Sequence, residues 1–337
     1  MWSRLLSVFL LSFLAIGTAQ AGSQVSDTTI STSQGSLYLL HRSPDQGPDK
    51  GVVLFLESYA VPTAAAFDVP GYSWMEHLAE RHYDCWAMDF RGFGHSSRPV
   101  AMDRPPQENR PVIRSADALA DVAEAMAYIS EQTHAKKITL IGWSYGSVIA
   151  AMFAADHPEL VDKVVLLGSM RAFPLPSMTM PLEAKDQPGV LNPALPAYQT
   201  VTPKAALNHW HMMEEGLGVV SEETFAKIEE VVASSDPAAS GQASPVIRRP
   251  IGPLVDLYEI WSNRPIYDAA KMRVPVLVVR GQQDHFAEKG LAGKFVNSPN
   301  ASEIEIPNAT HWVLYETGQG ALWAATDRFL SESVVKP

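Results

Sequence analysis

Residues 138–153 read ITLIGWSYGSVIAAMF, and this stretch decides the fold. The apolar, β-branched run 138–141 predicts a strand, and the Ala- and Val-rich run after Gly146 has helical character. Between them, the segment GWSYG at 142–146 predicts a sharp turn with Ser144 at its apex. Glycine on both sides suits a turn at which the strand and helix backbones pass close together. We therefore expect an exposed Ser144 hydroxyl at a helix start, where free N–H groups favour an anion.

Other apolar runs of strand length alternate with helical patterns along the chain. The run 51–56 predicts a strand covered on both faces, and 163–168 predicts another buried strand. The runs 83–89, 273–281 and 301–306 predict further strands of the sheet, the last of these being 301–306. Helical stripes fall between them. This alternation predicts the α/β class, with a mostly parallel, doubly wound sheet and right-handed crossovers.

The GWSYG turn, with a strand before it and a helix after it, resembles the nucleophile elbow of the α/β-hydrolase superfamily, in its serine hydrolase and esterase branch. The resemblance implies Ser144 as nucleophile, Asp284 as the acid in a G-x-x-D pattern, and His311 as the base in a loop after the last strand. His285 is a rival base, but consecutive residues on a tight turn rarely present their side chains to each other. A serine at the elbow argues against the aspartate-nucleophile dehalogenase and epoxide hydrolase branches.

The resemblance also places half of an oxyanion hole after the first buried strand. The family has His-Gly there, whereas this chain has Glu57 and Ser58. The backbone N–H donors would then be those of Tyr59 and Tyr145. A carboxylate beside a developing oxyanion would oppose it. We therefore expect Glu57 to be paired with a cation, for which Arg91 is the candidate, or to be buried and protonated with a raised pKa.

The composition changes at residue 170, where prolines and broken helical segments begin. We expect 170–263 to be a helical cap inserted into a core made of 22–169 and 264–337. Met and aromatic side chains suit irregular apolar ligands. Packing within the cap is the alternative for its Met and aromatic residues. The candidates for a substrate pocket are Trp143, Trp210, Met213 and Trp312.

Residues 1–21 are typical of a cleavable signal peptide: Arg4 precedes an apolar run, and Ala19-Gln20-Ala21 predicts a cut after Ala21. A secreted or periplasmic location follows, with a retained N-terminal anchor as the alternative. The chain has 26 Lys and Arg against 37 Asp and Glu, a formal net charge of −11, and losing Arg4 makes it one unit more negative. Neither nucleic acid nor stable association with an anionic membrane is expected.

A Ser-His-Asp arrangement predicts acyl transfer to water, because a serine hydroxyl needs an adjacent base held by an anion. The sequence has no metal-ligand spacing, phosphate loop or dinucleotide fingerprint, so no cofactor is expected. The preferred interpretation is an exported carboxylesterase acting on a small-molecule ester. One alternative is a peptidase similar to prolyl aminopeptidases, with Glu214 or Glu215 holding the substrate amine. The other is a catalytically inactive binding module.

Overall fold

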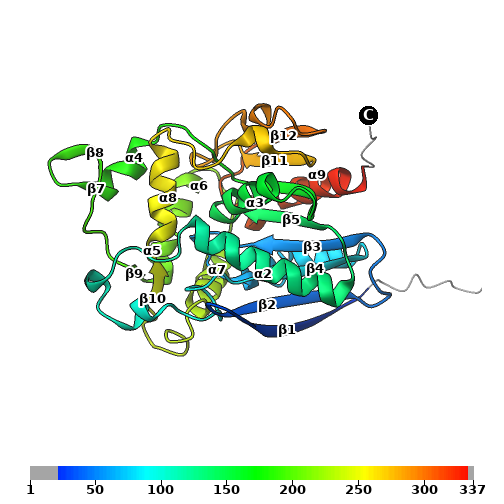
Figure 1. Cartoon of the computed structure of the whole chain (residues 1–337), viewed down its shortest axis with the longest axis horizontal. Helices are drawn as coiled ribbons and strands as arrows, with labels where there is room; N and C mark the ends of the chain where they lie inside the picture. Colours follow the sequence, from blue (N-terminus) through cyan, green and yellow to red (C-terminus); the bar gives the residue numbers. More distant parts are fainter. Residues whose placement is uncertain (1–21, 333–337) are drawn as a thin grey trace, which may run out of the picture.

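In the computed structural model, which describes residues 22–332, eight strands form one sheet (Figure 1). The predicted signal peptide lies outside the described residues. The order is β1-β2-β4-β3-β5-β6-β11-β12. The β1–β2 and β2–β4 pairs are antiparallel and the other pairs are parallel, which confirms the predicted α/β class. The strands are β1 (Ser23–Thr32), β2 (Gly35–Pro44), β3 (Gly51–Leu56), β4 (Tyr83–Met88), β5 (Ile138–Trp143), β6 (Val161–Leu167), β11 (Val276–Gly281) and β12 (Ala301–Ile306).

Helices cover both faces of this sheet, so its central strands are apolar on both sides. In β3, Leu54 and Leu56 pack in the cluster that contains the buried side chains of α2 (Ser115–Thr133) and α3 (Tyr145–Asp156). Val53 and Phe55 pack in the other cluster, with α1 (Trp74–Ala79) and α9 (Gln319–Ser331). Figure 1 shows α2 and α3 across the front of the sheet. Alternate residues of a strand point to opposite faces, which explains why the run 51–56 is apolar throughout.

The segment predicted as a helical cap lies between β6 and β11, at one end of the sheet (Figure 1). It is not purely helical, because two small antiparallel sheets, β7–β8 and β9–β10, lie among its helices. Prolines within and beside these strands interrupt the helical pattern, since proline lacks the N–H that a helix interior requires. The elements are α4 (Pro176–Thr179), β7 (Glu183–Ala184), β8 (Gln187–Leu191), β9 (Tyr198–Val201), α5 (Pro203–Ala206), α6 (Asn208–Glu214), α7 (Glu222–Ser234), β10 (Ile247–Pro250) and α8 (Gly252–Trp261).

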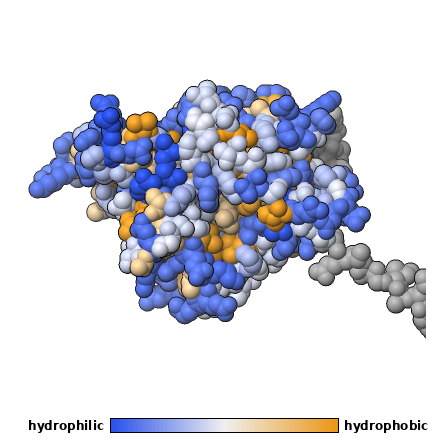
Figure 2. All heavy atoms as spheres, turned by 90° about the horizontal axis from the view of Figure 1, so that it is seen from below, coloured by the Kyte–Doolittle hydropathy of each residue, from blue (hydrophilic) through white to orange (hydrophobic). Residues whose placement is uncertain are grey.

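The surface carries few large exposed hydrophobic side chains, and they come from separate elements. Val100, Met212 and Val296 are the most exposed of those described, at 70–72%. The face in Figure 2 is largely hydrophilic, with small, separate hydrophobic patches. Within residues 22–332, no helix combines the length and apolar character that crossing a bilayer requires.

Candidate active site

Ser144 occupies a strained turn between β5 and α3. Its φ of 57° and ψ of −120° lie in a region that residues with a side chain rarely adopt. The flanking glycines permit the turn. A Cβ on Gly142 would lie 2.4 Å from the carbonyl oxygen of Gly146, and one on Gly146 would lie 2.3 Å from that of Leu56. Both glycines are therefore needed for backbone approach, as the sequence predicts, and Ser144 remains partly exposed at the helix start.

His311 and Asp284 come from the loops after β12 and β11, and their side chains meet. Nδ1 of His311 lies 2.8 Å from Oδ2 of Asp284, and both residues are buried. The other carboxyl oxygen accepts the N–H groups of Phe286 and Ala287, at 2.9 and 3.1 Å. His285 is exposed, so the rival base points away from this pair. Because Nδ1 faces Asp284, Nε2 is the nitrogen left for exchanging a proton with a substrate or a nucleophile.

Two more glycines let the loops around this pair come together. A Cβ on Gly281, at the end of β11, would lie 2.3 Å from the carbonyl oxygen of Ala309. Gly168, which follows β6, has a φ of 59°, and a Cβ there would lie 2.7 Å from Cε1 of His311. The chain therefore passes directly beside the imidazole, and a side chain at position 168 would displace it.

Ser144 and His311 line one cavity of about 320 Å³ beneath the inserted segment. Its wall is mainly apolar, with a small group of polar side chains. The hydroxyl of Ser144 and the imidazole of His311 are not hydrogen-bonded to each other, and such bonds often tighten only when substrate binds. The remaining lining residues are Tyr59, Ala60, Met178, Gln199, Val201, Ala205, Ala206, His209, Arg249, Leu254, Leu257, Trp261, Phe286 and Trp312.

The two proposed oxyanion donors lie where the backbones of β3 and β5 run side by side. Leu56 pairs with Gly142 in the sheet, so the segment carrying Tyr59 follows β3 next to the elbow. Within the described chain, the backbone N–H groups of Tyr59 and Tyr145 donate no hydrogen bond. Tyr145 is the first residue of α3, where N–H groups have no partner inside the helix. Two free donors beside a serine are what an oxyanion hole requires.

Glu57 is buried and is not paired with Arg91, so that predicted pairing is wrong. Arg91 instead bonds Asp121, with Nε 2.5 Å from Oδ1. Oε1 of Glu57 accepts the N–H of Phe90 at 2.9 Å, and Oε2 is buried without a partner. Burial, together with the charge of Asp89, raises the pKa of the Glu57 carboxyl well above its usual value. The other expectation, a buried and protonated carboxyl, therefore fits the structure, and a neutral group does not oppose an oxyanion.

Only Trp312 of the four predicted pocket residues lines the cavity. Trp143 is fully buried under the site and donates from Nε1 to the carbonyl oxygen of His311 at 2.9 Å. Trp210 donates to Oε1 of Glu316 at 2.9 Å and stacks on Trp312, with ring centroids 5.9 Å apart. Met213 packs at the edge of the core. The indole N–H groups of Trp143 and Trp210 donate to acceptors that lie more than 100 residues away in the sequence, so the sequence pattern does not reveal them.

The main polar group that the sequence did not reveal is Arg249, on β10. It lines the cavity, although only 7% of the residue is exposed. Its Nη1 donates to the carbonyl oxygen of Tyr59 at 3.2 Å, and its guanidinium lies 4.6 Å from the centre of the Tyr59 ring. The only sequence signal is the pair Arg248-Arg249 inside a short apolar and proline-bounded strand, which is an unusual place for two charges.

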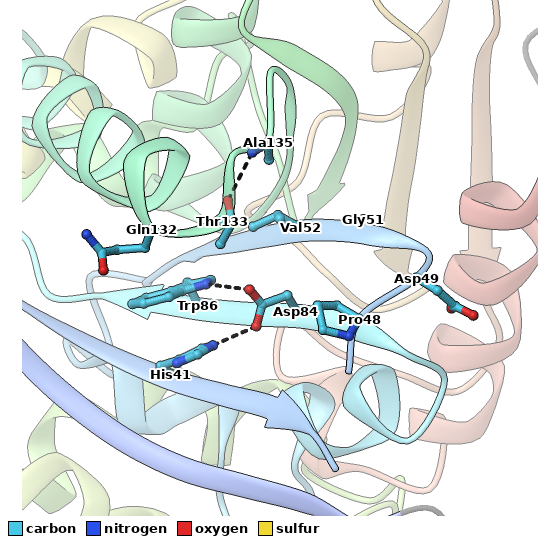
Figure 3. A pocket seen from close by; sticks show the side chains of 10 residues that line it. All are labelled: His41, Pro48, Asp49, Gly51, Val52, Asp84, Trp86, Gln132, Thr133 and Ala135. Atoms are coloured by element: carbon cyan, nitrogen blue, oxygen red, sulfur yellow. Dashed lines mark hydrogen bonds and ion pairs between the residues drawn. The ribbon is translucent and has the colours of Figure 1, made fainter. Parts of the chain in front are cut away.

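A larger cavity, of about 650 Å³, lies at the opposite end of the strands (Figure 3). It is lined by Gly51 and Val52 at the start of β3 and by Asp84 near the start of β4, whereas Ser144 follows the last residue of β5. Figure 3 shows its His41–Asp84 pair, with Nε2 2.6 Å from Oδ1. The Thr133 hydroxyl there is engaged at the end of α2, donating to Ile129 and accepting from Ala135. The cavity therefore offers a histidine and a carboxylate but no free hydroxyl nucleophile among its lining residues.

Potential metal ligands do not cluster within residues 22–332, where no group of three or more His, Cys, Asp or Glu side chains is placed to hold an ion.

The sheet order, the inserted segment and a serine at a strained strand–helix turn define the α/β-hydrolase class. A family model described as "alpha/beta hydrolase fold" matches residues 64–317, and the chain belongs to this family.

Known proteins similar to this chain are hydrolases of more than one kind. Human "Serine hydrolase BPHL" is 31% identical over 98 residues, which are 28% of this chain and 29% of that protein. "Epoxide hydrolase 1" of Caenorhabditis elegans is 28% identical over 128 residues, 37% of this chain and 27% of that protein. The chain thus matches less than a third of the length of each. The solved enol-lactonase from Burkholderia xenovorans LB400 has a TM-score of 0.61 at 15% identity, over 90% of this chain and 100% of that chain, a likeness that shows the fold alone.

Proposed function

We propose that this protein is an exported serine hydrolase that cleaves a carboxylic ester through an acyl-enzyme. The observation that carries the proposal is a shared cavity. Ser144 and His311 both line it, and Asp284 binds Nδ1 of His311 at 2.8 Å. A hydroxyl, a base and an anion that orients the base are the three groups that nucleophilic acyl transfer requires.

In this mechanism Oγ of Ser144 attacks the ester carbonyl, and Nε2 of His311 takes its proton. Asp284 keeps the proton of the imidazole on Nδ1 and stabilises the imidazolium that forms. The N–H groups of Tyr59 and Tyr145 bind the tetrahedral oxyanion. The intermediate then releases the alcohol, which receives its proton from His311. Water repeats the sequence on the acyl-enzyme, so an ester and water give a carboxylic acid and an alcohol.

The alternatives fit the cavity less well. A peptidase similar to prolyl aminopeptidases needs a carboxylate to hold the substrate amine, and neither Glu214 nor Glu215 lines the cavity. An epoxide hydrolase of this superfamily uses an aspartate at the elbow, where this chain has Ser144. An inactive binding module would have no need for a buried His311–Asp284 pair beside a strained serine.

A fluorophosphonate probe tests the proposal directly, because it labels an activated serine. The probe should label the wild-type protein and fail to label Ser144→Ala. Ser147→Ala is the matched control, since its hydroxyl is buried one turn further along α3 and already donates to the carbonyl oxygen of Ser144. An unlabelled wild-type protein that is folded would favour the binding module. Hydrolysis of a proline arylamide in preference to an aryl ester would favour the peptidase.

Export is a separate part of the proposal, supported by the sequence pattern of residues 1–21. Expressing the full chain in a bacterium and determining its N-terminal residue tests it. A mature protein that begins at Gly22 in the periplasmic or secreted fraction supports the predicted cut. A retained N-terminus in the membrane fraction supports the anchor instead.

A further inference from the structure

Two adjacent arginines on β10 have opposite environments. Arg248 forms a two-point ion pair with Asp236, with Nε 2.9 Å from Oδ2 and Nη2 3.1 Å from Oδ1. Arg249 points to the other face of the strand, as alternate residues do. It is 93% buried, and no carboxylate of the described chain lies within ion-pair distance of it. Other buried arginines, such as Arg91 and Arg280, are paired with carboxylates.

The hydrogen-bonding capacity of Arg249 is mostly unused. A guanidinium has five N–H donors and stays charged in proteins. Here Nη1 donates to the carbonyl oxygen of Tyr59, Nε is buried without a partner, and Nη2 has no hydrogen-bond partner among the described residues. Burial without a counterion is unfavourable for a cation. A charged side chain held in this way is typical of a ligand site that is completed by an anion.

The cavity around Arg249 has the charge that an anion would need. Its lining contains the Arg249 guanidinium and no carboxylate. The imidazoles of His209 and His311 also line it but are not counted as charges, because burial lowers the pKa of His209 and His311 acts as a neutral base. Asp284 lies behind His311 and is hydrogen-bonded to it, and Glu57 next to the proposed oxyanion hole is buried with a raised pKa. The protein as a whole carries a formal charge of −11, so this cationic cavity is a local feature and not a consequence of composition.

We infer that the ester substrate carries a carboxylate group, which the Arg249 guanidinium binds inside the cavity of Ser144. A planar guanidinium matches a carboxylate with two parallel hydrogen bonds. The apolar wall formed by residues such as Leu254, Leu257 and Phe286 would contact the hydrocarbon part of the same molecule. This inference deepens the proposed ester hydrolysis and rests on it. It gives Arg249 a binding role and leaves the chemical steps to Ser144 and His311.

Pairs of esters that differ in one charge test the inference. The first pair, 4-nitrophenyl hemiglutarate and 4-nitrophenyl hexanoate, places the carboxylate on the acyl part. The second, 4-acetoxybenzoate and 4-methylphenyl acetate, places it on the alcohol part. For at least one pair, the wild-type kcat/KM for the anion should exceed that for the neutral ester by roughly 10- to 100-fold, the range expected of hydrogen bonds to a charged group. In Arg249→Met that ratio should fall to about one. In Arg249→Lys it should lie between the ratios of the wild type and of Arg249→Met.

The ratio of kcat/KM between the anionic and the neutral ester distinguishes two roles of Arg249: binding a substrate carboxylate and supporting the loop of Tyr59. Loss of the bond from Arg249 to the Tyr59 carbonyl would slow both esters of a pair equally and leave the ratio unchanged. Arg248→Met is the matched control, because Arg248 is paired with Asp236, and it should retain the wild-type ratio. Equal losses for both esters in Arg249→Met, or a wild type without preference in either pair, would overturn the inference.

A binding measurement keeps this test distinct from the test of hydrolysis. In the Ser144→Ala variant, calorimetry should detect monomethyl glutarate and not the neutral dimethyl glutarate, and Arg249→Met in that background should abolish the difference. If the probe labels the wild type but neither the ester pairs nor calorimetry shows a preference for the anion, the carboxylate site alone is overturned. Anion binding in a protein that never labels would overturn the proposed hydrolysis alone.

Discussion

Replacing Glu57 with glutamine should stabilise the protein, and more so as the pH rises. The folded protein holds this carboxyl neutral, because burial raises its pKa well above the usual 4.5. In the unfolded chain the carboxyl ionises above that value. The folded state therefore binds the extra proton, and the wild type loses stability as the pH rises from about 4.5 towards the folded-state pKa. Glutamine keeps the shape and can still accept the N–H of Phe90, but it does not titrate.

The size of the effect follows from the number of pH units involved. Each unit of difference between the folded and unfolded pKa values is worth about 1.4 kcal/mol. As long as the folded carboxyl stays protonated, ionisation of the unfolded chain costs the wild type about 3 kcal/mol at pH 7 and about 1 kcal/mol at pH 5. The stability gained by Glu57→Gln should therefore grow by about 2.5 kcal/mol between pH 5 and pH 7.

Urea unfolding at pH 5, 6 and 7 measures the difference in free energy of unfolding between the wild type and Glu57→Gln. The contributions of the other titrating groups are the same in both proteins and cancel in this difference. Glu131→Gln, an exposed residue of α2, is the matched control and should show no such trend. A stability difference that stays flat with pH would show that Glu57 is ionised in the folded protein, which would refute the reasoning. Hydrolysis of an aryl ester should largely survive in Glu57→Gln. Loss of activity with the fold intact would give Glu57 a direct chemical role.

Three further predictions concern the proposed catalytic groups. Ser144→Ala and His311→Ala should each lower kcat for an aryl ester by several orders of magnitude, and the double variant should be barely slower than either, because such residues act as a unit; losses that multiply would contradict the assignment. Asp284→Asn should lower kcat by roughly 10⁴-fold, since the imidazole tautomer would be wrong, and near-normal turnover would point to another acid. Gly168→Ala should reduce kcat strongly in a protein that still unfolds cooperatively, because its Cβ would lie 2.7 Å from Cε1 of His311; unchanged kcat would mean that the imidazole is not confined there.

The inserted segment is connected to the elbow through a buried polar group. Asp256 of α8 accepts the hydroxyl of Tyr145 at 3.0 Å and the backbone N–H of Ser115 at 2.7 Å, while Arg114 donates to its other oxygen at 2.7 Å. The residue proposed as an oxyanion donor is thus held by the same segment that closes the cavity. A buried carboxylate with several donors rigidifies its surroundings, because each donor that is lost weakens the stabilisation of a buried polar group.

Local rules were enough to predict the parallel strands of the sheet and the elbow. The run 51–56 had to be covered on both faces because it is apolar throughout, and it is β3, an interior strand of the sheet. The GWSYG segment had to be a tight turn, because glycine at 142 and 146 leaves room for backbone atoms that a Cβ would strike. Chain order also placed Asp284 and His311 after the last two strands, and carboxyl ends of parallel strands gather at one edge.

Tertiary packing decided which side chains reach the cavity. Trp143 and Trp210 are of a residue type that often lines pockets, yet both lie in the core. Trp143 donates to the backbone oxygen of His311, and Trp210 donates to the carboxylate of Glu316. Arginine is usually exposed, yet Arg249 is buried and lines the same cavity as Ser144 without a counterion. The sequence allows either an ion-paired or a protonated Glu57 carboxyl, and its buried surroundings in the fold favour the protonated form. Turn and strand geometry depend on neighbours in the sequence, whereas side-chain direction, burial and pKa depend on partners that only the folded chain brings together.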